Sequence, residues 1–453
     1  VGWAAAPRVG LAVAVATAVM ILGATKGLVP SEARAAGIAT CVLVVLAAQA
    51  LSPRRHLILT AFLALVALIP TTALLVDSGA SPVIYQPFGE DSLAYQGHAH
   101  EILRTGSLEG GESVFFYQPA MRYLLFVGHA LFGAGDVLPV AVAMGLFALA
   151  LTLCLVRLVP GFTALRAAGG RVRERLRRSG DVLAALAVVA LLFVLVHGGV
   201  ERFFRSGASE APTWIIVPAA VALLFGPASR AAWATGSALV GLWVALRLEY
   251  LPAALFVLLL FLSLPLRRGE RVAWAAGGLF LALGAIVLHN VAYGSELALV
   301  RAEPVAEGAT VLVASDSGIS ALGNLWAALS DPTARTELVA HVEAILYLPF
   351  DASLTLQELT QAPHNPAQRL AFHGLLLAWV AAVASVLLRW RETTWVAKGM
   401  AALPVVVLAP FLAFNVTTNY PRQIVLGYVT MGVAAIYVIG RGRRPAGEAP
   451  KGP

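Results

Sequence analysis

The residues best suited to chemistry gather in one segment, Gly89 to Gly133, of an otherwise apolar chain. The segment opens with adjacent carboxylates, Glu90 and Asp91. Further polar groups follow within it: His98, His100, Glu101, Tyr117 and Arg122. A carboxylate can take a proton from a hydroxyl or bind a divalent cation, and a guanidinium pairs well with phosphate oxygens. These residue types predict either catalysis or the binding of a charged ligand.

The acidic pair has a simpler interpretation as two solvated loop acids. Against it stands a helical pattern that begins at Leu93, which places Asp91 at the N-terminus of a helix. Helix capping alone would explain one acid there but not two. His98 and His100 are two residues apart and share no helix face, so they are poor joint metal ligands. Asp91 is therefore the leading catalytic candidate.

Three later positions add ionisable groups near the ends of apolar runs. Glu210 precedes Pro212, Arg247 and Glu249 occupy the short turn ALRLEYLPA, and Arg422 lies in NYPRQ. Ionisable groups at membrane depth are costly and are candidates for function. The simpler alternatives are that Arg247 and Glu249 pair with each other, and that Arg122 only reaches to the membrane surface.

The composition is that of a membrane protein. The chain has 453 residues, 59% hydrophobic and 13% charged, with a mean hydropathy of +0.80, whereas soluble domains carry about 25% charged residues. Apolar runs close to the bilayer-spanning length of about 20 residues recur along it. We predict an all-α polytopic protein with about twelve spans: Val9–Val29, Ala35–Leu51, Leu57–Val76, Val137–Leu158, Val182–Val196, Pro212–Phe225, Ala231–Leu246, Leu251–Leu266, Val272–His289, Leu370–Leu388, Val396–Phe414 and Ile424–Ile439.

Basic residues predict the orientation, because cytoplasmic loops carry an excess of Lys and Arg. The Arg171–Arg178 region and the other basic clusters all fall on one side if Met121 to Phe132 is an interfacial helix and not a span. Between Asp77 and Asp136 there are two basic residues against seven acidic ones. The sequence thus predicts an N-terminal transmembrane hairpin (1–56), a membrane domain (57–440) with external loops 77–136 and 291–369, and a basic cytoplasmic tail (441–453).

The sequence lacks the motifs that mark several functional classes. The chain has no Walker loop, no paired-histidine metal motif and no dinucleotide fingerprint. The two cysteines, Cys41 and Cys154, lie inside predicted spans and have no metal-ligand spacing. The net charge of +7 is explained by cytoplasmic anchoring and gives no reason to expect nucleic acid. ATP-driven transport by this chain alone is therefore not expected.

The chain resembles the GT-C fold glycosyltransferases, of the protein mannosyltransferase and aminoarabinose transferase type. The resemblance is carried by GEDSLAYQGHAHEIL, FFYQPAMRYLLFVGHALFG, RSGASEAPTWIIVPAAVALL, ALRLEYLPAALFVLLL and NYPRQIVLGYVTMGV. It implies Asp91, with Glu90 beside it, as the catalytic acidic position and Pro119 to Gly133 as an interfacial helix. The chain departs from the pattern in its two extra early spans and in having no large C-terminal soluble domain.

The resemblance implies transfer of a sugar from a polyprenyl-phosphate donor to a glycan, lipid or protein acceptor. Asp91 would be the base, with inversion at the anomeric carbon. A divalent metal ion is a candidate cofactor at Asp91 or Glu90. The expected place is a bacterial inner membrane, with the site facing the periplasm or cell exterior. The alternative is a secondary transporter or flippase of lipid-linked glycans. The substrate-binding candidates are Tyr117, Arg122, Glu210, Arg247, Glu249 and Arg422.

Overall fold

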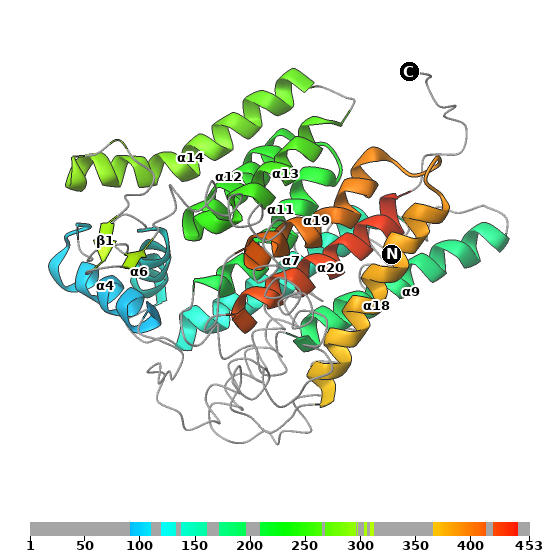
Figure 1. The fold of residues 1–453 in the computed structure, drawn as a ribbon, viewed down its shortest axis with the longest axis horizontal. Helices are drawn as coiled ribbons and strands as arrows, with labels where there is room; N and C mark the ends of the chain where they lie inside the picture. The colour runs from blue at the N-terminus through cyan, green and yellow to red at the C-terminus, as the bar shows by residue number, and fades with distance from the viewer. Residues whose placement is uncertain are drawn as a thin grey trace, which may run out of the picture.

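The computed structural model describes residues 91–109, 119–132, 137–160, 172–195, 209–264, 268–295, 297, 303–305, 309–311, 366–413 and 420–442. Within these ranges the chain forms eleven α-helices and one short 3-10 helix, with a two-stranded hairpin beside them (Figure 1). The helices are α4 (Asp91–Thr105), α6 (Ala120–Phe132), α7 (Val137–Leu158), α9 (Val172–Leu195), α11 (Glu210–Phe225), α12 (Arg230–Leu246), η2 (Leu248–Tyr250), α13 (Leu251–Leu262), α14 (Arg268–Gly294), α18 (Pro366–Leu388), α19 (Trp395–Ala413) and α20 (Tyr420–Arg441).

The structure confirms the prediction of a mainly α-helical protein with apolar helices. Nine of the predicted spans overlap described helices, and the range predicted for Val137–Leu158 is that of α7. Among the described residues, three helical stretches are long and apolar enough to cross a membrane: Arg268–Gly294, Leu370–Leu388 and Ile424–Arg441. The first three predicted spans lie outside the described residues.

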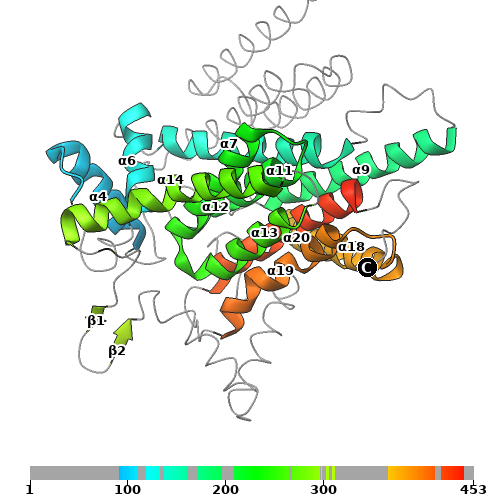
Figure 2. The same ribbon diagram turned by 90° about the horizontal axis from the view of Figure 1, so that it is seen from above.

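Helix α20 forms the centre of the bundle. Its residues from Ile424 to Val438 are buried almost without interruption, and it packs against α18, α19, α9 and α11 (Figure 2). Helices α14 and α18 instead expose large apolar side chains, among them Phe280, Leu281 and Leu377. An apolar exposed surface on long helices is what lipid would cover, so burial separates the core helix from the outer ones.

Helices α12 and α14 share the most extensive contact between helices in the described part of the chain. A Cβ placed on Gly278 of α14 would lie 2.6 Å from the Ala234 carbonyl oxygen and 2.7 Å from the Ala238 amide nitrogen of α12. Glycine therefore permits an approach that any side chain would prevent. The adjacent Gly277 has no atom within 4 Å of its corresponding position and faces away from this contact.

One end of the bundle is held by arginines that donate to backbone carbonyls. Arg157 Nε donates to Ala222 O at 2.9 Å and its Nη2 to Pro227 O at 2.7 Å. Arg441 Nη2 donates to Arg157 O at 3.0 Å, and Arg271 Nη1 to Phe261 O at 2.8 Å. Since the last carbonyls of a helix have no partner within it, these arginines cap α11, α7 and α13. We call this the basic end: Arg157, Arg230, Arg271 and Arg441.

The opposite end holds groups of both signs. Because α11 runs in the reverse direction to α12, and α13 to α14, the start of α11, the end of α12 and the end of α14 all lie away from the basic end. We call this the mixed-charge end: Arg122, Glu210, Arg247, Glu249 and His289.

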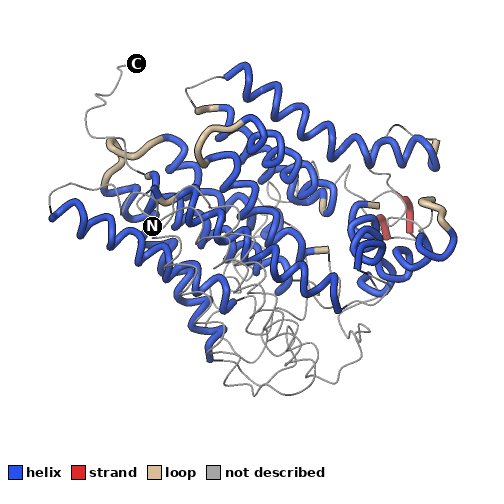
Figure 3. The backbone as a smooth tube through the Cα atoms, turned by 180° about the vertical axis from the view of Figure 1, so that it is seen from behind, coloured by secondary structure: helices blue, strands red, loops and turns tan. Residues whose placement is uncertain are grey.

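A short hairpin follows α14 and was not anticipated in the all-α prediction. Strands β1 (Glu303–Val305) and β2 (Ala309–Val311) pair antiparallel, with Glu303 opposite Val311. Its two strands are coloured red in Figure 3, whereas the other regular elements of the described chain are helices. Helix α14 ends at Gly294 and is followed by Ser295, whose φ is positive at 56°; a left-handed residue after the last turn is a common helix end.

Candidate functional site

Arg247 stands where the chain reverses between two helices. It is the C-cap of α12 and has extended backbone angles, φ −153° and ψ 108°. Helix η2 and then α13 follow at once, with a proline in the first turn of α13. The start of α11 lies alongside, with Ser209 at its N-cap and Glu210 as its first residue. This geometry brings the side chains of two separate helix ends together.

Arg247 holds three side chains at once. Its Nη2 lies 3.1 Å from Glu210 Oε1. Its Nη1 donates to Glu249 Oε1 at 3.0 Å, and its Nε to Ser209 Oγ at 3.2 Å. The side chain of Glu210 is 1% exposed, that of Arg247 17% and that of Glu249 28%. The three ionisable residues form a partly open cluster whose innermost member is Glu210. We refer to Ser209, Glu210, Arg247 and Glu249 as the Arg247 cluster.

The electrostatics of the Arg247 cluster favour its charged state. Burial lowers the pKa of Arg247, but the charges of Glu210 and Glu249 outweigh burial and raise that pKa above its ordinary value. Helix ends act in the same sense, since an acid is favoured at the N-terminus of α11 and a cation at the C-terminus of α12. With both carboxylates ionised, one guanidinium and two acids give a net charge of −1. Arg247 is thus a neutralised cation and not an isolated one.

Helix α4 comes close to the Arg247 cluster. Tyr95 of α4 lies within electrostatic reach of Arg247, as does Tyr250. Asp91 is the first residue of α4 and stands four residues before Tyr95, one turn away on the same face. A helix with Asp91 at its N-terminus, as the sequence pattern predicts, is present. The side chain of Asp91 lies outside the described part of the structure.

A second cluster lies at the same end, between α6 and α14. Arg122 is fully buried, and its Nη2 lies 3.0 Å from His289 Nε2 and 3.4 Å from the carbonyl oxygens of Leu108 and Glu109. The hydroxyl of Tyr123 contacts His289 Nδ1 and donates to Leu108 O at 3.1 Å. Burial lowers the pKa of Arg122 and raises that of Tyr123. This second cluster holds α6, α14 and the 108–109 segment together.

Sequence reasoning missed His289 and Tyr123. His289 is the last residue of the predicted span Val272–His289. An ionisable group at membrane depth is itself a signal of function, and this signal could have identified His289. Tyr123 follows Arg122 directly, but its hydroxyl could be assigned no partner from the sequence. Their contact joins residues 166 apart in the chain, a pairing that local pattern does not encode.

The remaining predicted residues are distributed as follows. The structure brings Glu210, Arg247 and Glu249 together and places Arg122 in the second cluster. Arg422 lies in the first turn of α20, at the mixed-charge end; its side chain lies outside the described residues. Glu90 and Tyr117 also lie outside them. The role of Asp91 as the catalytic base stays a prediction.

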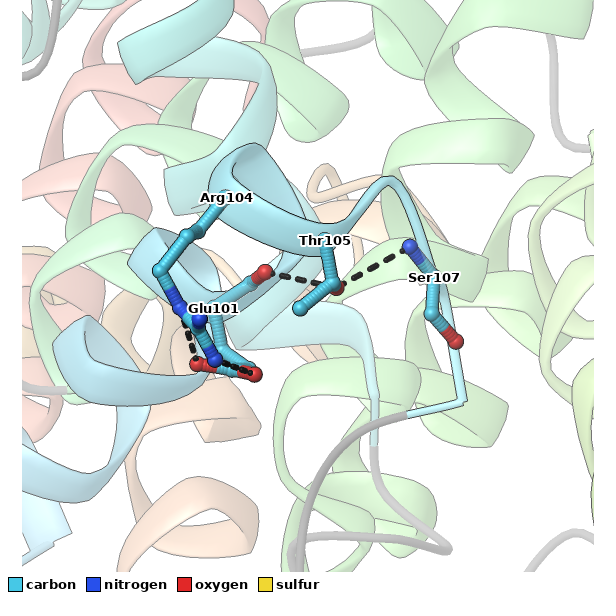
Figure 4. A network of polar contacts seen from close by, with 4 residues as sticks. All are labelled: Glu101, Arg104, Thr105 and Ser107. Atoms are coloured by element: carbon cyan, nitrogen blue, oxygen red, sulfur yellow. Dashed lines mark hydrogen bonds and ion pairs between the residues drawn. The ribbon is translucent and has the colours of Figure 1, made fainter.

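Glu101 belongs to neither cluster. It pairs with Arg104 one turn on in α4, with Nη2 2.6 Å from Oε1, and both side chains are exposed (Figure 4). Thr105 Oγ1 donates to Glu101 O at 2.8 Å and accepts from Ser107 N at 3.2 Å. Gly106, with φ of 72°, then ends the helix. His100 is exposed as well. The Glu101 carboxylate thus forms a surface ion pair near the C-terminus of α4.

The metal prediction concerns residues beyond the described side chains. Among the side chains that the structure describes, no group of three or more His, Cys, Asp or Glu could hold a metal ion. Cys154 is buried and its Sγ donates to Pro218 O at 3.2 Å. Asp91 and Glu90 remain the predicted ligands. Comparison of the chain with models of protein families, with curated proteins and with solved structures gives no match.

Proposed function

We propose that this protein is an integral membrane glycosyltransferase of GT-C type. It moves a hexose or pentose from a polyprenyl-phosphate donor to an acceptor hydroxyl at the external membrane face of a bacterial inner membrane. The observation that carries the proposal is the approach of α4, which begins at Asp91, to the Arg247 cluster at one end of an apolar bundle. A lipid donor suits this setting, because its chain can lie among the helices while its phosphate stays at the surface.

In the proposed reaction Asp91 acts as the general base. It takes the proton of the acceptor hydroxyl while that oxygen attacks the anomeric carbon. The bond from the anomeric carbon to the phosphate oxygen breaks, and polyprenyl phosphate leaves with both electrons of that bond. A single displacement inverts the anomeric carbon. Glu90 orients the acceptor beside Asp91, and no nucleotide is needed because the phosphate arrives on the lipid.

The charges of the mixed-charge end refine the roles of the arginines. Arg247 already balances Glu210 and Glu249, so it cannot hold an anionic leaving group alone. The proposal therefore assigns the phosphate to Arg247 and Arg422 together, with Glu249 and Tyr117 on the sugar side. Cations placed at the departing oxygen stabilise the charge that develops there. Arg122 is fully buried against His289, and this suits a positioning role.

The test is transfer in proteoliposomes from a radiolabelled polyprenyl-phosphate sugar, with a membrane extract as the source of acceptor. An enzyme leaves the label in a new glycosidic bond. The alternative function, a flippase or secondary transporter, is kept because a buried ion pair such as Arg247–Glu210 also occurs in transport proteins. That function would move the labelled lipid to the other leaflet with its glycosidic bond intact, and this outcome would contradict the proposal.

A further inference from the structure

We propose that His289 is a positioning residue that latches α6 and the 108–109 segment to the end of α14, and that it does so only while its imidazole is neutral. The latch consists of Arg122, Tyr123, His289 and the carbonyls of Leu108 and Glu109. It joins three stretches of chain that are distant in sequence. All of its contacts lie among described residues.

The protonation state of the latch follows from its donors and acceptors. An arginine side chain has only N–H donors, so Nε2 of His289 must accept from Arg122 across the 3.0 Å contact. A neutral imidazole then carries its proton on Nδ1 and donates it to the Tyr123 hydroxyl. The Tyr123 hydroxyl in turn donates to Leu108 O at 3.1 Å. In this relay Nε2 of His289 accepts, Nδ1 donates, and the Tyr123 hydroxyl both accepts and donates.

Protonation of His289 would break the relay. An imidazolium has N–H groups at both nitrogens, so Nε2 could no longer accept from Arg122, and two cations would face each other. The side chain of His289 is 4% exposed, so water could not screen them well. Acidification is therefore expected to release α6 and the 108–109 segment from α14.

The other titratable groups around His289 come from each element packed there. Helix α6 contributes Arg122 and Tyr123, and α14 itself contributes Tyr293, whose ring lies 5.0 Å from that of His289. Helix α12 has ionisable groups only at its ends, Arg230 and its cap Arg247, and α13 has none. The linking segment adds Glu109. All of these groups stay in place when His289 alone is replaced.

The latch also bears on the proposed site, and this consequence rests on the proposed function. Helix α6 packs on α4, and α4 carries Tyr95 near Arg247. Fixing α6 to α14 therefore fixes the helix that begins with Asp91. Release of the latch would let α4 move relative to the Arg247 cluster, which reduces transfer without removing a group that touches substrate.

The test compares His289→Gln with His289→Phe in the full-length protein. Glutamine offers one acceptor and one donor group but does not titrate, whereas phenylalanine keeps the bulk and removes both nitrogens. Hydrogen exchange of the amides of Gly106, Ser107 and Glu109 and of α6 is measured at about pH 7.5 and about pH 5, with intrinsic rates corrected for pH. Exchange in α20 is the control for folding.

We expect His289→Phe to exchange about tenfold faster in this region at both pH values. Wild type should become faster only on acidification, and His289→Gln should stay protected throughout. Wild-type protection in His289→Phe, no change of wild type with pH, or acid release in His289→Gln would each overturn the proposal. If α20 also loses protection in His289→Phe, Tyr123→Phe replaces it, and unchanged exchange near Leu108 in that variant contradicts the latch.

Transfer activity separates the latch from the proposed function. The latch predicts loss of transfer in His289→Phe, rescue in His289→Gln and a flatter acid limb in the Gln variant than in wild type. The expected exchange pattern without transfer in any variant would leave the latch standing and reject the glycosyltransferase. Normal transfer in a His289→Phe protein with faster exchange would remove its positioning role.

Discussion

The two ends of the bundle use arginine in different ways. At the basic end, Arg157, Arg271 and Arg441 donate to backbone carbonyls at the C-termini of helices. At the mixed-charge end, Arg247 faces two carboxylates and Arg122 faces a histidine as well as carbonyls. A carbonyl cannot change its charge, whereas a carboxylate or an imidazole can. Among these partly or fully buried arginines, the partner therefore separates structural from functional candidates, whereas Arg230 at the basic end pairs with Glu270 through largely exposed side chains.

The largest effect on stability is expected at the mixed-charge end, from Arg247→Ala. The change leaves Glu210, which is 1% exposed, as a buried acid without its cation, at a cost of about 3–5 kcal/mol. Denaturant unfolding in detergent measures it. Adding Glu210→Gln should recover much of the loss. The exposed pair Arg230–Glu270 is the control, and Arg230→Ala should cost about 0–1 kcal/mol. Equal losses of stability in Arg247→Ala and Arg230→Ala would refute the claim that burial makes the Arg247 ion pair the more costly one to break.

At the basic end, Arg157→Met should destabilise the fold by about 1.5–3 kcal/mol, because two carbonyls at the end of α11 lose a charged donor. Transfer per folded molecule should remain that of wild type. The measurement pairs denaturant unfolding with the proteoliposome assay. A loss of transfer in correctly folded Arg157→Met would break the comparison, since it would give the basic end a part in the chemistry.

The α12–α14 contact joins the two ends, and Gly278→Ala tests it. The new methyl group would meet the backbone of α12 at 2.6 Å and 2.7 Å, so we expect a loss of about 1–3 kcal/mol. Gly277→Ala is the matched control in the same helix and has open space around it. It should be neutral or stabilising by about 0.4–1 kcal/mol. Thermal unfolding of both variants would show whether the pairing is as close as described.

The smallest effect on stability is expected from Glu249→Gln. Its side chain is 28% exposed, and Arg247 keeps Glu210, so the cost should be about 0–1 kcal/mol. Transfer should nevertheless fall, with the change mainly in KM if Glu249 contacts the sugar. Steady-state kinetics over a range of donor concentration provide the measurement. Unchanged kinetics would sink the assignment of Glu249 to substrate.

Much of the helical architecture could be predicted from the sequence, because apolar runs and flanking Arg residues are local signals. The range of α7, the start of α4 at Asp91 and the break before α6 follow from such signals. The Arg247–Glu249 contact was open to prediction for the same reason, as both residues lie in one turn. The partners Glu210 and His289 are far away in the chain, and only packing brings them to Arg247 and Arg122. The hairpin could not be predicted, because each of its strands is only three residues long and carries no clear strand pattern.

The central claim is that chemistry takes place at the mixed-charge end, with Asp91 as the base. The most direct measurement is the rate of sugar transfer by Asp91→Asn beside Glu101→Gln, a carboxylate on the same helix that is paired at the surface. Loss of a general base predicts a fall of about 10²–10⁴-fold in Asp91→Asn, with wild-type transfer in Glu101→Gln and equal folded amounts. Near-wild-type transfer by Asp91→Asn would contradict the account.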